Sequence, residues 1–596
     1  MGVEIIIYLI AVPLIAGLLC LLIPKKINWL TQFISVATSI ISLFFSIFVY
    51  RIPPVRTQFF LLDGLNKFIV PAVALFGVLI VLYSLKSPFY NSYYTFTLWT
   101  LSAAFGAVLS NNLILFSIFW GFLALTLYLL IQINGTPNDK SDAASYAAKK
   151  TFIVVGGSDC FLLLGIAILW FLTGTFQIDK INIQQLSKLG TVAFLCFAIA
   201  AFAKAGAMPL HTWIPDMAVS APVPVTAFLP ASLDKLLGIY LLARVCVNMF
   251  KCSESLNVLL MIIGAITIVA AVFMAMIQHD LKKLLSYHAV SQVGYMVLGI
   301  GTGNIIGIAG GIFHMLNNAI YKSCLFLCGG SVEYRTGTSD LDKLGGLSKF
   351  MPITFTTCLI ASLSISGVPP FNGFVSKWMV YQGVIQTFQK TNFRIFAWIF
   401  LISAMFGSAL TLASFMKLIH AIFLGQTPKY KNGQIPKEVP WTMVLPEVIL
   451  AAVCIIFGIF AFQIPLKYFV FPPVPHFTGI WQPGLATVLI LIGLSIGLLI
   501  YLVSKLKIRE SITFIGGETL PQEVRVSGVD FYQTIKDIGF FKWMYSLAEK
   551  KIFDIYDWGK NVVLAISSVL SSVHTGNLHR YLIWCLIGTV ILLFVL

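Results

Sequence analysis

Long runs of apolar residues, separated by short polar segments, make up most of the chain. The hydrocarbon core of a bilayer needs about 20 apolar residues in one helix, so each such run predicts a membrane crossing. The pattern therefore predicts an all-α, polytopic membrane protein with about sixteen transmembrane helices. The predicted spans are 4–24, 29–50, 65–85, 93–110, 112–133, 152–173, 191–208, 223–249, 256–277, 284–300, 304–330, a broken span over 352–388, 395–424, 442–463, 482–504 and 580–596.

One stretch before the last span has a different pattern. From Ile552 onward, apolar residues repeat at helical spacing and polar residues take the opposite side, which predicts an amphipathic helix about 30 Å long. We expect it to lie in the membrane plane as a brace, and segment 540–547 to extend it. The alternative, a helix of a soluble domain, finds little support in the short, polar 505–540 flank. The apolar positions are Ile555, Tyr556, Gly559, Val562, Val563, Ile566, Val569, Leu570 and Val573.

Two spans are interrupted by prolines in comparable settings. The first reads "KAGAMPLHTWIPDM" at 204–217 and the second "SGVPPFNGFVSKW" at 366–378. Proline removes a backbone donor, so each helix should open and expose carbonyls at membrane depth, although a simple kink is the alternative. Paired broken helices in two halves of a chain indicate inverted repeats around ion sites. The predicted divisions are 1–92 (N-terminal helices), 93–250 and 251–425 (two repeats), 426–505 (C-terminal helices), 506–579 (polar segment and lateral helix) and 580–596 (final anchor).

The composition is that of a membrane protein and argues against nucleic acid as a partner. Hydrophobic residues make up 58% of the chain and charged residues 10%, which excludes a soluble surface. We interpret the net charge of +16 as reflecting the topology of the chain in the membrane and contact with anionic lipid. Aromatic and basic residues do not interleave as they do in nucleic-acid binders, so nucleic acid is not an expected partner. Lys and Arg concentrate in the odd-numbered loops, so both termini are predicted outside. The ten cysteines are scattered and predicted to be buried thiols, with no metal or cofactor bound.

Four lysines lie inside or at the edge of apolar runs: Lys204, Lys235, Lys322 and Lys377. A charged side chain within the bilayer is costly unless it faces a polar interior, so such residues usually mark a function. Their succession along the chain predicts an ion path.

Other polar groups follow helical geometry near these lysines. His314, Asn318 and Lys322 recur at steps of four, and a second row contains His288, Ser291, Gln292 and Tyr295. Steps of three and four place side chains on one helix face, which predicts rows of groups able to carry protons. The alternative is that they hydrogen-bond between helices and only hold the bundle together.

Four segments resemble the antiporter-like subunits of respiratory complex I and its relatives. They are "KAGAMPLHTWIPDMAVSAPVPVTAFLPASLDKLLGIYLLAR", "DLKKLLSYHAVSQVGYM", "IFHMLNNAIYKSCLFL" and "LDKLGGLSKFMP", and the amphipathic helix with its final span is similar to the NADH dehydrogenase subunit 5 type. The resemblance implies that Lys204 is the central proton carrier of a first half-channel, and that Lys322 and Lys377 are the connecting and exit lysines of a second. It also places Lys235 at the bridging lysine of the subunit 4 type. The same resemblance adds Asp159 and His314 as polar path residues, and we also predict that His211 belongs to the proton path.

The sequence departs from that family at one important position. The family carries a Trp-Glu pair whose glutamate modulates the first lysine, whereas this chain reads Trp120-Gly121. No acidic residue occurs from Pro88 to Gln132, so another carboxylate must take that role. We predict that Asp234 is the partner of Lys204.

The resemblance implies a subunit that translocates protons, or alternatively sodium, in a complex I-related, redox-driven pump such as an energy-converting hydrogenase or a ferredoxin/NADH-linked oxidoreductase. Such a chain holds no cofactor, and redox chemistry takes place in peripheral partner subunits reached through other membrane subunits. One alternative is a subunit of a multisubunit cation/proton antiporter without a redox partner. A second is a secondary transporter of small solutes. The expected location is the cytoplasmic membrane of a prokaryote.

Overall fold

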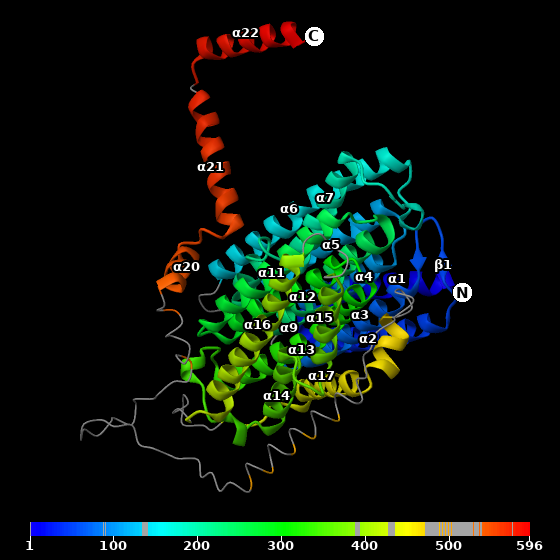
Figure 1. Ribbon diagram of the computed structural model, residues 1–596, viewed down its shortest axis with the longest axis vertical. Helices are drawn as coiled ribbons and strands as arrows, with labels where there is room; N and C mark the ends of the chain where they lie inside the picture. The colour runs from blue at the N-terminus through cyan, green and yellow to red at the C-terminus, as the bar shows by residue number, and fades with distance from the viewer. Residues whose placement is uncertain are drawn as a thin grey trace, which may run out of the picture. The chain divides into compact units, whose positions relative to one another are not determined.

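The chain is almost entirely helical in a computed structural model (Figure 1). The structure describes residues 2–87, 89, 91–133, 141–387, 394–426, 436–470, 539–574 and 576–595, with isolated positions between 471 and 538. Two compact units, Met1–Thr534 and Ile535–Leu596, are considered separately. The predicted span 482–504 and most of the polar segment after it lie outside the described residues.

The first unit is a bundle of long helices with one two-stranded sheet, in which β1 (Val55–Arg56) pairs antiparallel with β2 (Leu61–Leu62). Its α-helices are α1 (Gly2–Leu22), α2 (Asn28–Phe48), α3 (Gly64–Ser84), α4 (Asn91–Leu109), α5 (Leu113–Gln132), α6 (Ser141–Thr173), α7 (Lys188–Ala205), α8 (Trp213–Ser220), α9 (Val223–Phe228), α10 (Asp234–Arg244), α11 (Glu254–Met276), α12 (Leu281–Gly301), α13 (Ile305–Thr336), α14 (Pro352–Ser366), α15 (Asn372–Thr387), α16 (Arg394–Ile419) and α17 (Trp441–Ile459). Short 3-10 segments are η1 (Lys25–Ile27), η2 (Val49–Arg51), η3 (Ile178–Lys180), η6 (Leu341–Lys343) and η7 (Leu347–Lys349), and π-helical segments are η4 (Leu229–Leu233), η5 (Val245–Met249), η8 (His420–Leu424) and η10 (Phe462–Val470).

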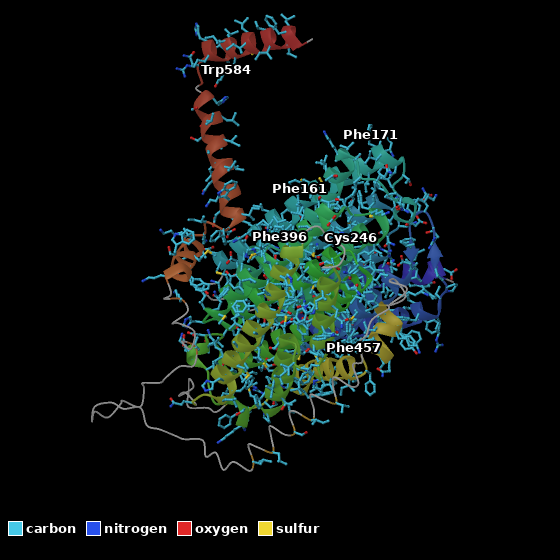
Figure 2. The ribbon with its side chains drawn as sticks, viewed as in Figure 1. Phe161, Phe171, Cys246, Phe396, Phe457 and Trp584 are labelled. Atoms are coloured by element: carbon cyan, nitrogen blue, oxygen red, sulfur yellow. The ribbon has the colours of Figure 1, made fainter. Side chains whose placement is uncertain are left out.

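The helices have the length and surface of a membrane protein. Among the described residues, ten helical stretches are long and apolar enough to cross a bilayer. Large apolar side chains such as Phe161 and Phe171 on α6 stay exposed on the outside (Figure 2), where a soluble protein would carry polar groups. The predicted multi-pass helical fold is confirmed, while the total of about sixteen crossings stays a prediction.

Helix α13 forms the axis of the first unit. It is buried over almost its whole length and packs against α9, α12, α14, α15 and α17. Polar side chains on this helix, His314 and Lys322 among them, are therefore enclosed by protein on all sides. The row predicted from the sequence lies within the bundle.

Both predicted helix breaks are present. Helix α7 ends at Gly206 and α14 ends at Gly367, and both glycines have φ of +80°. That left-handed conformation suits glycine, which has no Cβ, and it lets later backbone N–H groups close the helix end. Ala207 N–H donates to Phe202 O and Val368 N–H to Leu363 O.

After each break the chain continues as a second helix. Pro209 and the pair Pro369 and Pro370 lie in the connecting turns, which contain cis peptide bonds at 208–209 and 369–370. Pro215, which we predicted to interrupt the helix, instead lies in the first turn of α8, where a missing N–H is tolerated.

An ion pair ties the end of α10 to the start of α3. Asp63 caps α3 by accepting from Leu65 N and Asn66 N, and Arg244 Nη2 donates to Asp63 Oδ1 at 2.7 Å. Burial alone would raise the pKa of Asp63, but the hydrogen bond and charge of Arg244, with the backbone N–H groups of Asn66 and Leu65, lower it below the usual value. The helix carrying Lys235 is thus fixed at its far end.

Among its described residues, the second unit has three helices: α20 (Gly539–Glu549), α21 (Ile555–Val573) and α22 (Leu578–Val595). Helix α21 contains the predicted amphipathic stripe. Segment 540–547 does not extend α21, because Lys551, with φ of 56°, interrupts the helix between α20 and α21.

Candidate ion-translocation site

Four lysines are buried on four different helices of the first unit. Lys204 on α7, Lys235 on α10 and Lys322 on α13 are 0% exposed, and Lys377 on α15 is 2% exposed. In the described part of the chain none of the four forms an ion pair. Burying an ammonium without an ion pair is costly, so buried lysines of this kind usually mark a function.

The first lysine lies on an aromatic side chain. Lys204 Nζ is 5.0 Å from the centre of the Trp120 ring and 3.5 Å from Trp120 O. Two carboxylates, Asp234 and Asp159, are close enough for their charges to interact with Lys204. The predicted partner Asp234 is therefore a neighbour, and Asp159 is a second one.

Asp159 also stands beside Gly121. A Cβ added at Gly121 would lie 3.8 Å from Asp159 Oδ2, the nearest atom that it would meet. The space around position 121 thus already contains a carboxylate, contributed by α6 instead of α5. We infer that Asp159 supplies the negative charge that a glutamate at position 121 would supply.

Two lysines, Lys235 and Lys377, lie beside the ends of the two broken helices. A Cβ on Gly206 would lie 3.3 Å from Lys235 Nζ, and one on Gly367 would lie 3.1 Å from Lys377 Cδ. Lys377 Nζ donates to Ile365 O, near the end of α14, at 2.8 Å. The C-terminus of a helix carries partial negative charge and unpaired carbonyls, which favour a cation there. At the second break the glycine therefore leaves room for Lys377, whereas at the first a Cβ would meet Ile214 Cδ1, at 2.0 Å, before Lys235.

Lys322 connects α13 to α12 and α16. Its Nζ donates to Leu285 O at 2.8 Å and lies 5.5 Å from the centre of the Phe415 ring. The His288 ring packs against the same ring at a tilt, with centroids 4.7 Å apart and planes at 43°, and its Nε2 is 2.7 Å from Ser414 Oγ. The charge of Lys322 interacts with both His288 and Lys235, which joins the two halves of the row.

His314 links Lys322's helix to the second break. Its Nδ1 is 2.9 Å from Ser376 Oγ, next to Lys377, and its Nε2 is 3.1 Å from Gln292 Oε1. Lys377 Nζ in turn lies 4.6 Å from the centre of the Tyr295 ring. Of the second predicted row, Ser291 faces elsewhere, since it donates to Ile268 O on α11.

Several buried polar atoms along the row have no protein hydrogen-bond partner in the described structure. Fully buried polar atoms are normally hydrogen-bonded, and where protein offers no partner an internal water usually does. A concentration of such atoms beside titratable side chains is typical of a hydrated proton route. They are Asp159 Oδ1, both carboxylate oxygens of Asp234, Lys235 Nζ, His288 Nδ1, Gln292 Nε2 and both amide atoms of Asn318.

His211 lies in the turn between α7 and α8, where its carbonyl accepts from Ile214 N. Its place in an ion path stays a prediction.

Sequence reasoning missed three buried charged residues. Lys150 lies in α6, is 1% exposed and pairs with Asp216 at 2.7 Å. Lys417 on α16 donates to Met276 O and Gln278 O. Glu447 on α17 is 0% exposed. Lys150 and Glu447 lie close to the ends of apolar runs, and one charge at such an end carries little sequence signal.

Comparison with known proteins identifies the family in which this arrangement occurs. Residues 110–411 match the family described as NADH:quinone oxidoreductase/Mrp antiporter, TM, over just over half of the chain. The chain belongs to this family. Members named as Na(+)/H(+) antiporter subunit A1, from Staphylococcus aureus strains Newman and USA300, are 35% identical over 426 residues. The alignment covers 67% of this chain and 52% of theirs, so the chain spans about half the length of these curated relatives.

Three solved multisubunit membrane complexes contain chains with the fold of this family member. A chain of the membrane-bound sulfane sulfur reductase, an archaeal respiratory membrane complex, has a TM-score of 0.80 at 24% identity, covering 99% of both chains. A chain of the Mrp complex from Dietzia sp. DQ12-45-1b has a TM-score of 0.70 at 22% identity, covering 79% of this chain and 97% of that one. A chain of respiratory complex I from Thermus thermophilus has a TM-score of 0.66 at 19% identity, covering 78% of this chain and 97% of that one. The predicted family is confirmed.

Proposed function

We propose that this chain is an ion-translocating, antiporter-like subunit of a multisubunit membrane complex related to complex I, and that protons are the ion that it moves. The observation that carries the proposal is the row of buried lysines that form no ion pair in the described part of the chain, interleaved with histidines and with the buried carboxylates of Asp159 and Asp234. Each neighbour in the row interacts with the next through charge or hydrogen bonds. The row crosses from the first broken helix to the second.

The proposed route has two halves that meet at α10 and α13. Asp159, Asp234 and Lys204 form the first half. Lys235 joins it to Lys322, and the second half continues to Lys377 at the second break. Since Lys235 and Lys322 repel when both are charged, a proton on one favours its release from the other. The remaining members are His288 and His314, which lie between Lys322 and Lys377, and His211 at the first break.

The geometry fits single protons better than a solute. The side chains of the row are single titratable groups that are each wrapped by other helices, and α13 carries much of the row through the packed centre of the bundle. The fold match over 99% of a chain from a respiratory membrane complex supports the redox-driven reading. The 35% identity with a Na(+)/H(+) antiporter subunit supports a second candidate, a subunit of a cation/proton antiporter without a redox partner. We place the complex in the cytoplasmic membrane of a prokaryote, with the electron chemistry of a redox-driven complex in partner subunits.

The test is proton translocation in membrane vesicles that contain the whole complex. Lys322→Ala and Lys377→Ala should abolish or strongly reduce it while leaving the complex assembled, because each change removes a carrier and no ion pair. Lys343→Ala is the matched control, since that side chain, at the end of η6, is 71% exposed. Normal translocation by either buried-lysine variant would refute the route. Subunit composition of the purified complex separates the two candidates: redox subunits support the first, and antiporter subunits alone the second.

A further inference from the structure

Lys417 is a buried lysine that the proposed route does not use. It lies near the end of α16, just before the π-helical segment η8, and it is 5% exposed. The four lysines of the row are exposed by 2% or less, so they need another group that connects them to water. Lys417 lies where such a connection can be made.

The ammonium of Lys417 lies at the turn between α11 and α12. Its Nζ donates to Met276 O at 2.7 Å and to Gln278 O at 3.1 Å. The next residue, His279, has a side chain that is 47% exposed, and its Nδ1 is 2.7 Å from Asp342 Oδ2. Exposed polar and charged side chains are costly in hydrocarbon, so this turn meets water. Lys417 thus reaches from the packed bundle to its hydrated end.

Ser414 connects the same helix to the lysine row. It lies three residues before Lys417, and residues three apart are neighbours on a helix surface. Its Oγ is 2.7 Å from His288 Nε2, and the His288 ring and Lys322 Nζ both lie against the ring of Phe415. The charges of Lys322 and Lys417 both interact with His288. His288 is therefore the common neighbour of the two lysines.

Lys322 and His288 also meet along one turn of α12. Lys322 Nζ donates to Leu285 O at 2.8 Å, and Leu285 lies three residues before His288 on that helix. In the described structure His288 Nδ1 has no protein partner, so this nitrogen remains for exchange with Lys322, directly or through an internal water. A histidine whose two ring nitrogens have separate neighbours can take a proton on one side and release it on the other.

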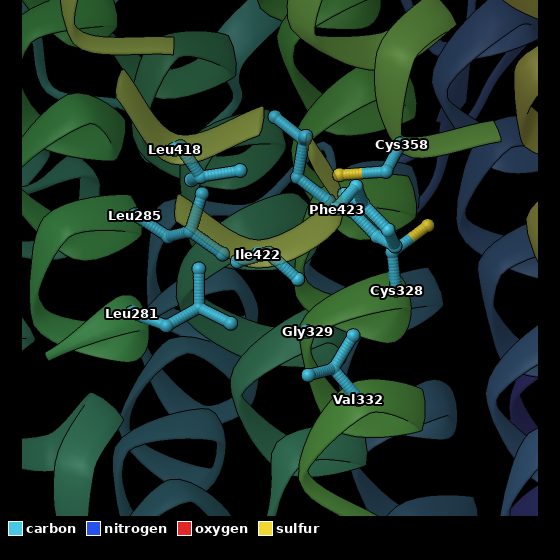
Figure 3. A pocket seen from close by; sticks show the side chains of 10 residues that line it. Leu281, Leu285, Cys328, Gly329, Val332, Cys358, Leu418, Ile422 and Phe423 are labelled. Atoms are coloured by element: carbon cyan, nitrogen blue, oxygen red, sulfur yellow. The ribbon is translucent and has the colours of Figure 1, made fainter. Parts of the chain in front are cut away.

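The residue after Lys417 faces an apolar pocket. Leu418 lines it together with Leu281 and Leu285 of α12, as Figure 3 shows. Successive residues of a helix point about 100° apart, so Leu418 faces α12 while Lys417 reaches the end of α11. Leucine side chains cannot carry protons, so the polar connection between α16 and α12 is the contact of Ser414 with His288.

We propose that Lys417, Ser414 and His288 connect Lys322 to the protein surface at the α11–α12 turn, as a branch through which the route exchanges protons with water. The branch rests on the proposed function. In the inward step an N–H bond of the Lys417 ammonium breaks and an O–H bond forms on Ser414, while the hydrogen that Ser414 held passes to Nε2 of neutral His288. Charged His288 then gives its Nδ1 proton to neutral Lys322.

The first test separates this role from that of a fixed helix cap, since a cation also stabilises the carbonyl end of α11. Arginine keeps the charge and the donors of Lys417 but is not deprotonated in proteins. In vesicles that contain the whole complex, we expect Lys417→Arg to assemble and to lose about a hundredfold in proton translocation. Lys343→Arg is the matched control, because that side chain is 71% exposed. Normal translocation by an assembled Lys417→Arg complex would show a cap only and overturn the branch.

The second test changes no charge and decides the matter if Lys417→Arg does not assemble. Ser414→Ala should reduce translocation about tenfold, the scale of one lost hydrogen bond, and Ser414→Thr should recover it by returning a hydroxyl. Thr411→Val is the control, because it removes a buried hydroxyl one turn earlier on α16 that donates to Gly407 O. Normal translocation by Ser414→Ala would overturn the branch. If Lys377→Ala still abolishes translocation in that case, the proposed function stands and the branch alone fails.

Discussion

Moving a carboxylate from α6 to α5 tests whether the first half of the route requires a negative charge beside Lys204. Asp159→Asn removes one of the two negative charges near Lys204, and Gly121→Glu can return one from α5. A Cβ at position 121 would meet only Asp159 Oδ2, at 3.8 Å, which is an ordinary contact. Two unit charges ~6 Å apart interact by about 3 kcal/mol at an effective dielectric constant of 20. That energy corresponds to about a hundredfold in the population of charged Lys204.

The assay is proton translocation in vesicles, with complex assembly checked on a native gel. We expect Asp159→Asn to reduce translocation by about tenfold to a hundredfold. The double variant with Gly121→Glu should recover most of the activity, since it restores the charge from the neighbouring helix. The control Gly121→Gln in the same background adds similar bulk without charge and should not recover it. Full activity of Asp159→Asn, or equal rescue by glutamine, would refute the reasoning.

Three further predictions concern other parts of the chain. Asp234→Asn should impair translocation about as severely as Lys204→Ala, and the double variant should be little worse than either, because both remove one coupled unit; full activity of Asp234→Asn would mean that the first half is idle. Ile555→Asp or Val562→Asp on the apolar stripe of α21 should weaken assembly on a native gel more than Lys560→Asp on its polar side, and equal assembly would argue against a brace. The lowered pKa of Asp63 means that the stability from its pair with Arg244 is complete above the ordinary aspartate pKa of about 4 and is lost as pH falls through the lower native value. Asp63→Asn, which leaves Arg244 buried and unpaired, should cost about 3 kcal/mol in unfolding experiments and remove that pH dependence; an unchanged pH profile would contradict it.

Features that depend on one helix at a time could be predicted from the sequence. Apolar runs gave the spans, because burial in lipid requires about 20 such residues in succession. Proline at 209, 369 and 370 marked both breaks, because proline removes a backbone hydrogen-bond donor. The spacing of His314 and Lys322 placed them on one helix, where the structure has them.

Features that depend on how helices pack against one another could not be predicted in the same way. Asp159 and Gly121 lie on different helices, and only their packing brings the carboxylate beside the glycine. Glu447 has polar neighbours on three other helices, but in the sequence it is one acid at the start of an apolar run. Lys150 follows a second lysine near a polar segment, so its burial against Asp216 also depends on tertiary packing.

The central claim is that buried lysines bind and release protons instead of acting as fixed charges. Lys322→Arg and Lys377→Arg separate these roles, because arginine keeps the positive charge and is not deprotonated in proteins. The measurement is the initial rate of proton uptake into vesicles that contain equal amounts of assembled complex. The account predicts that both arginine variants lose translocation as completely as the alanine variants. Translocation at the unaltered rate with arginine at either position would contradict it.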